Sequence, residues 1–267
     1  MDFSEINHRG LVLIGCGRMG GAMLTGWLSG GIDPAAVTVI DPNAAPDWAD
    51  RGVRLNVAPP SDPAVLVLAV KPQMMENVLT GLTVGGGTLV LSVAAGVTLA
   101  AYEAVFPDTP VVRAMPNTPA AIGQGISAVV GNNSISPAGM DLAESLMSAV
   151  GKVVRLDNEA QMDAVTAVSG SGPAYVFHMI EAMAEAGVTQ GLSPELSLEL
   201  ARATVAGAGA LAMADDTPPA VLREAVTSPD GTTAAGLTRL MDTEQGLRPL
   251  IGRTVAAAAD RSRELGQ

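Results

Sequence analysis

The sequence predicts an α/β fold: an N-terminal Rossmann-like domain with a mostly parallel sheet, followed by a C-terminal all-α domain. Three observations predict it. Short apolar runs alternate with helical patterns in the first half, which is typical of a parallel sheet with crossover helices. A glycine turn at residues 15–20 lies between a strand pattern and a helical pattern. Strand signals stop near residue 157, so we expect domains at 1–157 and 158–267.

The predicted strands are short, and several are continuous apolar runs rather than alternating ones. Such runs indicate parallel strands that are buried on both faces. The strands are expected at residues 10–14, 37–40, 64–70, 88–93, 109–114, 127–131 and 152–156. Helices are expected between them at 22–28, 73–82 and 137–150. In the second domain they are expected at 159–168, 173–186, 194–213, 219–226, 231–241 and 247–265.

Composition limits the class of protein. Hydrophobic residues make up 48% of the 267 residues and aromatic residues only 3%, so a large aliphatic core is expected. A formal net charge of −12 argues against nucleic-acid binding. A single cysteine, Cys16, cannot form an internal disulfide, and with two histidines it makes no zinc pattern. We therefore expect no metal site.

The start of the chain shows no targeting signal. Residues 1–10 are polar, contain no apolar signal-peptide core, and are interpreted as a flexible segment carrying His8. The most apolar run, at 88–101, is interrupted and is shorter than the ~18 residues of a membrane span. We expect a cytoplasmic protein without a membrane segment.

The predicted helix at 194–213 is rich in alanine and glycine. Small residues let helices approach closely, and the helical half looks too small to bury all its apolar faces within one chain. We expect this half to form an oligomer. The alternative is the core of a monomeric helical bundle.

The glycine turn has the spacing of a dinucleotide-binding loop. Gly15 would allow the tight turn, Gly17 would let the backbone approach a pyrophosphate, and Gly20 would let the helix pack closely on the strand. The free N–H groups at the start of that helix would favour an anion. Asp41 lies 41 − 20 = 21 residues after Gly20, near the ~20 expected for a ribose-binding carboxylate.

Asp41 bears on the choice of coenzyme. A carboxylate at this place suits the 2′-hydroxyl of NAD and would repel the 2′-phosphate of NADP. No lysine or arginine lies between Asp41 and Arg51 to offset it. The alternative is that Asp41 is only a turn residue, since it is followed by Pro42 and Asn43.

Other polar or small segments follow strands or precede helices. Lys71 follows a predicted strand and could meet a phosphate, although it could equally be a solvated loop residue. Small residues at 94–96 leave room for a flat ring. In the helical half, two polar glycine-rich breaks at 169–173 and 226–233 precede helices. Either break could bind an anionic group, although helix capping alone would explain each.

Several catalytic arrangements are absent. No Ser/His/Asp or Cys/His set is visible, and no lysine follows Lys152. His178 and Tyr175 are interpreted as packing residues. Chemistry that needs little acid–base help fits best, such as hydride transfer to a protonated imine.

These motifs together resemble the pyrroline-5-carboxylate reductase family. The stretches that carry the resemblance are Ile14 to Met19, Ala69 to Gln73, Ala94 to Gly96, RAMPNTPA from Arg113, DAVTAVSGSGPAYVF from Asp163, and VTSPDGTTAAGL from Val226. The resemblance implies hydride transfer from NAD(P)H to 1-pyrroline-5-carboxylate, giving L-proline in the last step of proline biosynthesis. It also implies a C-terminal dimerisation domain and a homodimer that can build a larger ring.

The resemblance also implies roles for particular residues. The pyrophosphate would be held by Ile14, Gly15, Cys16, Gly17, Arg18 and Met19, with Asp41 and Asn56 near the adenosine ribose. The nicotinamide would be lined by Ala69, Val70, Lys71, Pro72, Ala94, Ala95 and Gly96. The substrate would be bound by Ser228, Gly231, Thr232 and Thr233, with Ser171 near that pocket. Thr233 would act catalytically, through a hydrogen bond to the ring nitrogen.

The chain departs from the family pattern at two positions. Asp230 stands where the family usually has glycine, and Met241 where it usually has glutamate.

Family members more often prefer NADPH, whereas Asp41 favours NADH, so either coenzyme is expected. Two other functions fit the sequence less well. A β-hydroxy-acid dehydrogenase would need a catalytic lysine in the helical half. A non-catalytic dinucleotide sensor would not need the second set of polar breaks.

Overall fold

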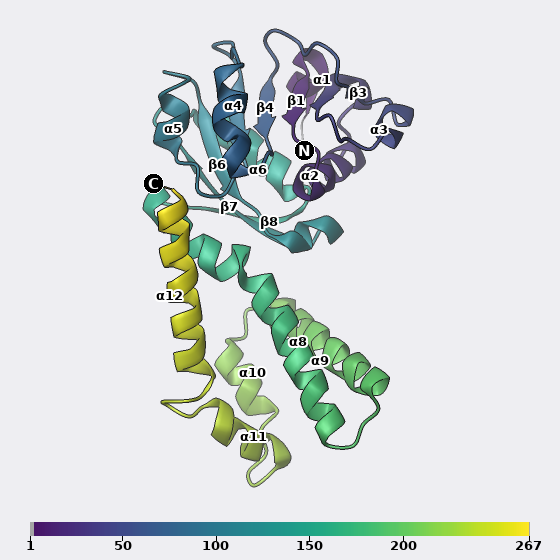
Figure 1. The fold of residues 1–267 in the computed structure, drawn as a ribbon, viewed down its shortest axis with the longest axis vertical. Helices are drawn as coiled ribbons and strands as arrows, with labels where there is room; N and C mark the ends of the chain where they lie inside the picture. The colour runs from purple at the N-terminus through teal and green to yellow at the C-terminus, as the bar shows by residue number, and fades with distance from the viewer. Residues whose placement is uncertain (1–2, 267) are drawn as a thin grey trace. The chain divides into compact units, whose positions relative to one another are not determined.

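The computed structural model describes residues 3–266, and its fold is drawn in Figure 1. Eight strands form one sheet, in the order β3-β2-β1-β4-β5-β6-β7-β8. Neighbouring strands are parallel, except that β6 and β7 are antiparallel. The strands are β1 (Leu11–Ile14), β2 (Val37–Ile40), β3 (Arg54–Leu55), β4 (Val65–Leu68), β5 (Leu89–Ser92), β6 (Val111–Met115), β7 (Gly125–Gly131) and β8 (Gly151–Arg155). The predicted fold class is confirmed.

Helices lie between most of these strands and make up most of the chain after β8. In the first part they are α1 (Ser4–Arg9), α2 (Arg18–Ser29), α3 (Asp47–Asp50), α4 (Met75–Thr80), α5 (Leu99–Glu103), α6 (Pro137–Ser148) and α7 (Met162–Val165). Further along are α8 (Gly172–Thr189), α9 (Pro194–Ala214), α10 (Pro219–Ala225), α11 (Thr232–Leu240) and α12 (Leu247–Leu265). Short 3₁₀ turns lie at Pro34–Ala36, Pro72–Met74, Thr118–Ile122 and Glu159–Gln161.

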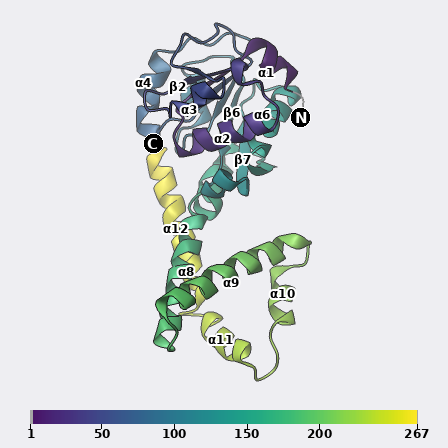
Figure 2. The ribbon, with the colours of Figure 1, turned by 90° about the vertical axis from the view of Figure 1, so that its right-hand side faces the viewer.

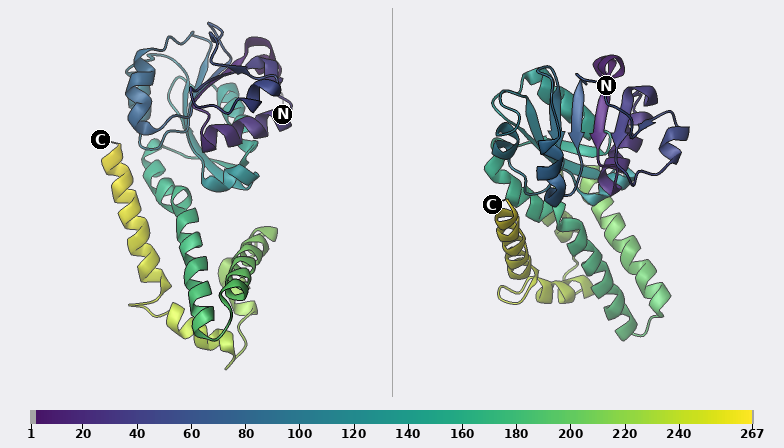
Figure 3. Two further views of the ribbon diagram at one scale, coloured as in Figure 1. Left: turned by 45° about the vertical axis from the view of Figure 1, so that its right-hand side comes forward. Right: turned by 45° about the horizontal axis from the view of Figure 1, so that its top comes forward.

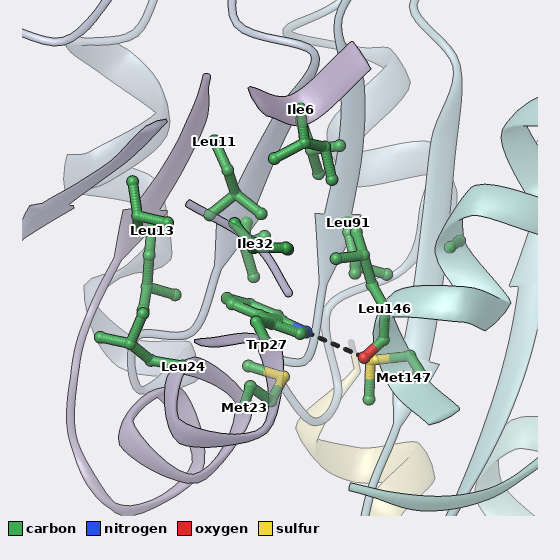
Figure 4. Packing of buried hydrophobic residues seen from close by; sticks show 14 of the residues in the cluster. Ile6, Leu11, Leu13, Met23, Leu24, Trp27, Ile32, Leu91, Leu146 and Met147 are labelled. Atoms are coloured by element: carbon green, nitrogen blue, oxygen red, sulfur yellow. Dashed lines mark hydrogen bonds between the residues drawn. The ribbon is translucent and has the colours of Figure 1, made fainter. Parts of the chain in front are cut away.

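Both faces of the sheet are covered. Helices α2 and α6 lie on one face and α4 on the other (Figure 2). Leu11 and Leu13 of β1 pack with residues of α2 and α6, while Val12 and Ile14 pack with residues of α4 and α5. Trp27 anchors the first face: its side chain is fully buried, and its Nε1 donates to the carbonyl oxygen of Leu146 at 2.9 Å (Figure 4). Burial on two faces explains why these strands are continuous apolar runs.

The chain divides into two compact units. One runs up to Ser171 and includes the residues from Ala258 onward, and the other is Gly172–Ala257. In the second unit, α8 and α9 pack against each other (Figure 3). The segment at 159–171 belongs to the first unit because Met162 is buried among the side chains of α4 and α5. A functional domain boundary at 157/158 stays a prediction.

Three local expectations were wrong. Among the first ten residues, those at 4–9 form α1, because Ile6 is fully buried against the core; residues 1–2 lie outside the described part. The break expected at 169–173 is a π-helical turn, Thr166–Gly170, that continues from α7 towards α8. His178 does not pack in the core: its side chain is 83% exposed on α8, and its Nδ1 lies 3.0 Å from Oε2 of Glu181.

Candidate active site

The glycine turn follows β1 and cannot accept side chains at two of its positions. Gly15 has φ +91°, and a Cβ there would lie 2.6 Å from the carbonyl oxygen of Ala69. A Cβ on Gly20 would overlap the carbonyl oxygen of Gly15. Only glycine fits such close backbone approaches. The turn is therefore pressed against the end of β4, the strand next to β1.

Gly17 is different because it faces open space. A Cβ on Gly17 would meet no atom within 4 Å, and the residue is exposed. Gly17 is also the N-cap of α2, and no side chain caps that helix. The N–H groups of the first turn thus lack a side-chain acceptor, next to the exposed Arg18. Together, the open backbone at Gly17 and these N–H groups form a phosphate cradle, which fits the pyrophosphate of a dinucleotide.

Asp41 ties the end of β2 to the glycine turn. Its Oδ2 accepts from the N–H of Cys16 at 2.7 Å, and its Oδ1 accepts from the N–H of Asn43 at 2.8 Å. Asn56 holds the same place, because its side chain bonds both the N–H and the carbonyl oxygen of Asp41, at 2.9 and 3.0 Å. Asp41 is therefore a turn residue and a neighbour of the phosphate cradle at the same time.

Cys16 lies in an acidic environment within this turn. Burial, together with the carboxylates of Asp41 and Asp47, raises the pKa of its thiol to about 11. The thiol therefore stays protonated near neutral pH, and a nucleophilic role for it is not supported.

The ends of β4 and β5 lie beside the glycine turn along the same edge of the sheet. Ala69 donates its N–H to the carbonyl oxygen of Ile14 at 2.8 Å, and β5 is the next neighbour of β4. The chain then continues through the exposed Lys71, and, after β5, through the buried Ala94 to Gly96 at φ +78°. Since the strand order reverses between β1 and β4, this edge is the topological switch point where such sheets bind ligands.

A second group of predicted residues lies in the helical unit, at the start of α11. Gly231 donates its N–H to the carbonyl oxygen of Ser228 at 3.1 Å, and Asp230 has φ +58°. This geometry matches a type II turn, in which glycine is favoured at the third position. The turn leaves Thr232 and Thr233 exposed in the first turn of α11, which has no side-chain cap.

Ser171 follows the π-helical turn. Its N–H donates to the carbonyl oxygen of Thr166 at 2.8 Å, which is the wider hydrogen-bond spacing of a π helix. Pro173 follows soon after and has no N–H with which to continue an α-helical pattern. Ser171 and the turn at 228–231 belong to different compact units, and each is described by itself.

Sequence reasoning missed two side-chain pairs that adjoin the segment after β5. Tyr102 bonds Ser92, and Glu159 pairs with Arg113. These pairs are 10 and 46 residues apart, and no local pattern relates them. No group of three or more His, Cys, Asp or Glu within residues 3–266 is placed to hold a metal ion. No helix in that range is long and apolar enough to cross a membrane.

Comparison with known proteins places this geometry in a family. The chain is 40% identical over 266 residues to the pyrroline-5-carboxylate reductase of Pseudomonas aeruginosa, covering 96% of this chain and 97% of that protein. The chain belongs to the pyrroline-5-carboxylate reductase family. A family model described as pyrroline-5-carboxylate reductase dimerisation matches residues 159–265, and one described as NADP oxidoreductase, coenzyme F420-dependent, matches residues 11–96.

Solved structures of pyrroline-5-carboxylate reductases share the fold over nearly all of the chain. The enzyme from Coxiella burnetii has a TM-score of 0.85 at 33% identity, covering 97% of this chain and 99% of that one. The enzyme from Plasmodium falciparum, solved with NADP bound, has a TM-score of 0.82 at 26% identity, covering 98% and 99%. The resemblance inferred from the motifs is confirmed.

Proposed function

We propose that this chain is an NAD(P)H-dependent pyrroline-5-carboxylate reductase, which converts 1-pyrroline-5-carboxylate to L-proline in the last step of proline biosynthesis. The observation that carries this function is the 40% identity to a pyrroline-5-carboxylate reductase over 96% of the chain. The geometry supports it, because the switch point of the sheet holds an open glycine turn with an uncapped helix behind it.

The coenzyme would lie along the carboxyl edge of the sheet. The N–H groups after Gly17 would hold the pyrophosphate, since that is where the backbone faces open space. Asp41 and Asn56 would meet the adenosine ribose. The segments from Ala69 to Pro72 and from Ala94 to Gly96 would line the nicotinamide. When bound, the reduced coenzyme supplies the hydride that goes to the imine carbon, while the ring nitrogen carries a proton.

The turn before α11 would bind the substrate. A carboxylate suits the N-terminus of a helix whose first N–H groups have no side-chain acceptor. Ser228 and Thr232 would add hydroxyl groups to that anion site, which also includes Gly231. A substrate-binding role for Ser171 is proposed from the family resemblance alone. Thr233 would hydrogen-bond the ring nitrogen and so orient the imine for attack. This role needs a neutral hydroxyl, so no ionisable acid is required of the protein.

Both coenzymes are proposed, with NADPH first. The relative from Plasmodium falciparum, solved with NADP bound, supports NADPH. The carboxylate of Asp41 supports NADH as a second coenzyme, because it would repel the 2′-phosphate of NADPH. Its Oδ2 lies 2.7 Å from the backbone nitrogen of Cys16, beside the proposed pyrophosphate site. A comparison of kcat/KM for the two coenzymes, each at low concentration, decides which coenzyme is preferred.

The helical unit would join two copies of the chain. Large apolar side chains on α8 and α9 are exposed in a single chain, as Phe177 and Met213 are at 60% and 61%. The match to the dimerisation model over residues 159–265 supports a homodimer. A larger ring and a cytoplasmic location stay predictions of the same proposal.

The test is an assay of purified protein with 1-pyrroline-5-carboxylate. Oxidation of NAD(P)H, followed at 340 nm, should require that substrate and should produce L-proline identified by chiral chromatography. A β-hydroxy acid in place of the imine should give no turnover. Absence of L-proline at micromolar enzyme, with both coenzymes tried, would rule out the proposed reaction.

A further inference from the structure

Two buried side chains fix the beginning of the segment that follows β5. Ser92, the last residue of β5, and Tyr102 of α5 are both fully buried, and their hydroxyl oxygens lie 2.5 Å apart. The Oγ of Ser92 also accepts from the N–H of Ala94 at 3.3 Å. Tyr102 thus fixes the side chain of Ser92, and Ser92 in turn fixes the backbone N–H of Ala94.

An ion pair between the buried Arg113 and the partly buried Glu159 fixes the end of the same segment. Oε1 of Glu159 accepts from Nη1 of Arg113 at 2.7 Å and from the N–H of Leu99 at 2.8 Å. Arg113 lies on β6 and is only 5% exposed. A buried cation without a partner is strongly unfavourable, so this pair is held firmly. Glu159 therefore ties the N–H of Leu99 to the neighbouring strand.

The middle of the segment lies against the end of α12. A Cβ on Gly96 would be 3.3 Å from the carbonyl oxygen of Leu265, and one on Gly266 would be 3.1 Å from the carbonyl oxygen of Gly96. Ser262, one turn earlier, donates its hydroxyl to Oδ1 of Asp163 at 2.6 Å. The segment at 93–98 is thus restrained at its start, in its middle and at its end.

We propose that Tyr102 and Glu159 are positioning residues for hydride transfer, because they fix the segment at 93–98 against the nicotinamide ring. This inference rests on the proposed coenzyme site, in which Ala94, Ala95 and Gly96 line that ring. Neither residue needs to touch the coenzyme. Each acts through the backbone it holds, Tyr102 by way of Ser92 and Glu159 by way of the N–H of Leu99.

Small displacements at this place have large consequences. Hydride transfer requires the donor and acceptor carbons to be held close and aligned, and an error of about 1 Å can cost about a hundredfold in rate.

Burial raises the pKa of the Tyr102 hydroxyl to about 12, although its bond to Ser92 and the charge of Arg113 act against that rise. The phenol therefore stays protonated under ordinary assay conditions.

The test compares two ligands that differ by the nicotinamide ring. Tyr102→Phe removes the hydroxyl that bonds Ser92, and Glu159→Gln removes the negative charge that pairs with Arg113. Each variant should bind the reduced coenzyme about fivefold more weakly, as expected for one weakened interaction. They should bind ADP-ribose, or its 2′-phosphate if NADPH is preferred, within about twofold of wild type. Both affinities are measured by titration calorimetry. The kcat should fall while the KM for 1-pyrroline-5-carboxylate changes little.

Glu5→Gln is the matched control, because it neutralises a carboxylate paired at 2.7 Å with Arg9, in a helix that precedes β1. It should leave both affinities unchanged. Equal weakening of both ligands by Tyr102→Phe would overturn the proposal in favour of a general structural role, and so would no change in either. If the wild type binds the reduced coenzyme but makes no L-proline, the proposed reaction fails, while the ligand comparison still decides the positioning role.

Discussion

Asp41 shows how one side chain serves both the fold and the proposed site. Its two carboxylate oxygens accept from the N–H groups of Cys16 and Asn43, so it shapes the turn after β2 and holds the glycine turn. The sequence interpretation treated a turn residue and a ribose-binding residue as alternatives. In the structure the turn geometry is itself what brings the carboxylate to the glycine turn.

Replacing Asp41 by serine should shift the coenzyme preference further towards NADPH. Removing one negative charge near the expected 2′-phosphate should raise the ratio of kcat/KM for NADPH to that for NADH about tenfold. Steady-state kinetics with both coenzymes measures the ratio. Asp50→Asn serves as the control, because it removes a carboxylate from α3, outside the turn that contains Asp41. An unchanged ratio in Asp41→Ser would show that the carboxylate plays no part in selecting the coenzyme.

Cys16 should react slowly with alkylating agents despite its place in an open loop. With a pKa of about 11, roughly 0.1% of the thiol is ionised at pH 8, and the thiolate is the reactive form. The alkylation rate with iodoacetamide, followed by intact mass, should keep rising up to about pH 11. Because Cys16 is the only cysteine, each added group reports on it alone. Asp41→Asn should speed the reaction at pH 8, and a rate that levels off near pH 9 would contradict the assignment.

Thr233→Ala should impair catalysis without impairing coenzyme binding. Loss of a hydrogen bond to the ring nitrogen should lower kcat/KM for 1-pyrroline-5-carboxylate about a hundredfold. The dissociation constant of the reduced coenzyme should stay within about twofold. Thr238→Ala is the control, since that threonine lies on the same helix and its hydroxyl bonds the carbonyl oxygen of Ala234. Thr233→Ser should recover most of the activity. Equal losses in catalysis and coenzyme affinity would mean that the role is misassigned.

At the scale of elements, apolar sequence patterns identified the strands that are buried on both faces. The parallel strands were found because both of their faces are buried, which leaves uninterrupted apolar runs such as β4. The two-residue strand β3 and the helix α1 were missed because each offers too few apolar positions to show a period. The π-helical turn was mistaken for a loop because Gly170 and Ser171 are residues typical of turns.

The turn at 228–231 gives a test at this scale. Asp230 occupies the left-handed region, which explains why the family usually has glycine there. Asp230→Gly should preserve activity and stability, whereas Asp230→Val should destabilise the turn by about 1–2 kcal/mol, because a β-branched residue is strained at positive φ. Urea unfolding and kcat/KM report the two effects. Equal stability of both variants would show that the turn tolerates any side chain.

At the scale of the whole molecule, a mostly parallel sheet could be expected, but not the pair of strands that runs antiparallel. The apolar runs and the helices between them predict parallel neighbours, and five neighbouring pairs before β7 are parallel. The antiparallel pairing of β6 with β7 follows from a short connection through a 3₁₀ turn, Thr118–Ile122, which is too brief for a crossover helix. The ion pair between Arg113 and Glu159 has no sequence signature because it joins distant segments.

The exposed apolar side chains of the helical unit should be covered by a second copy of the chain. Phe177, 60% exposed on α8, is the largest of them, so Phe177→Glu should weaken self-association about a hundredfold or more. Sedimentation velocity across a dilution series measures this, with the wild type expected at twice the chain mass or a multiple of it. Ile122→Glu is the matched control, because Ile122 is 73% exposed in the other compact unit. Activity should fall with association only if the substrate turn before α11 depends on the partner for its shape. A wild type that sediments as a single chain at all concentrations would contradict the dimer, and equal dissociation in both variants would place the interface elsewhere.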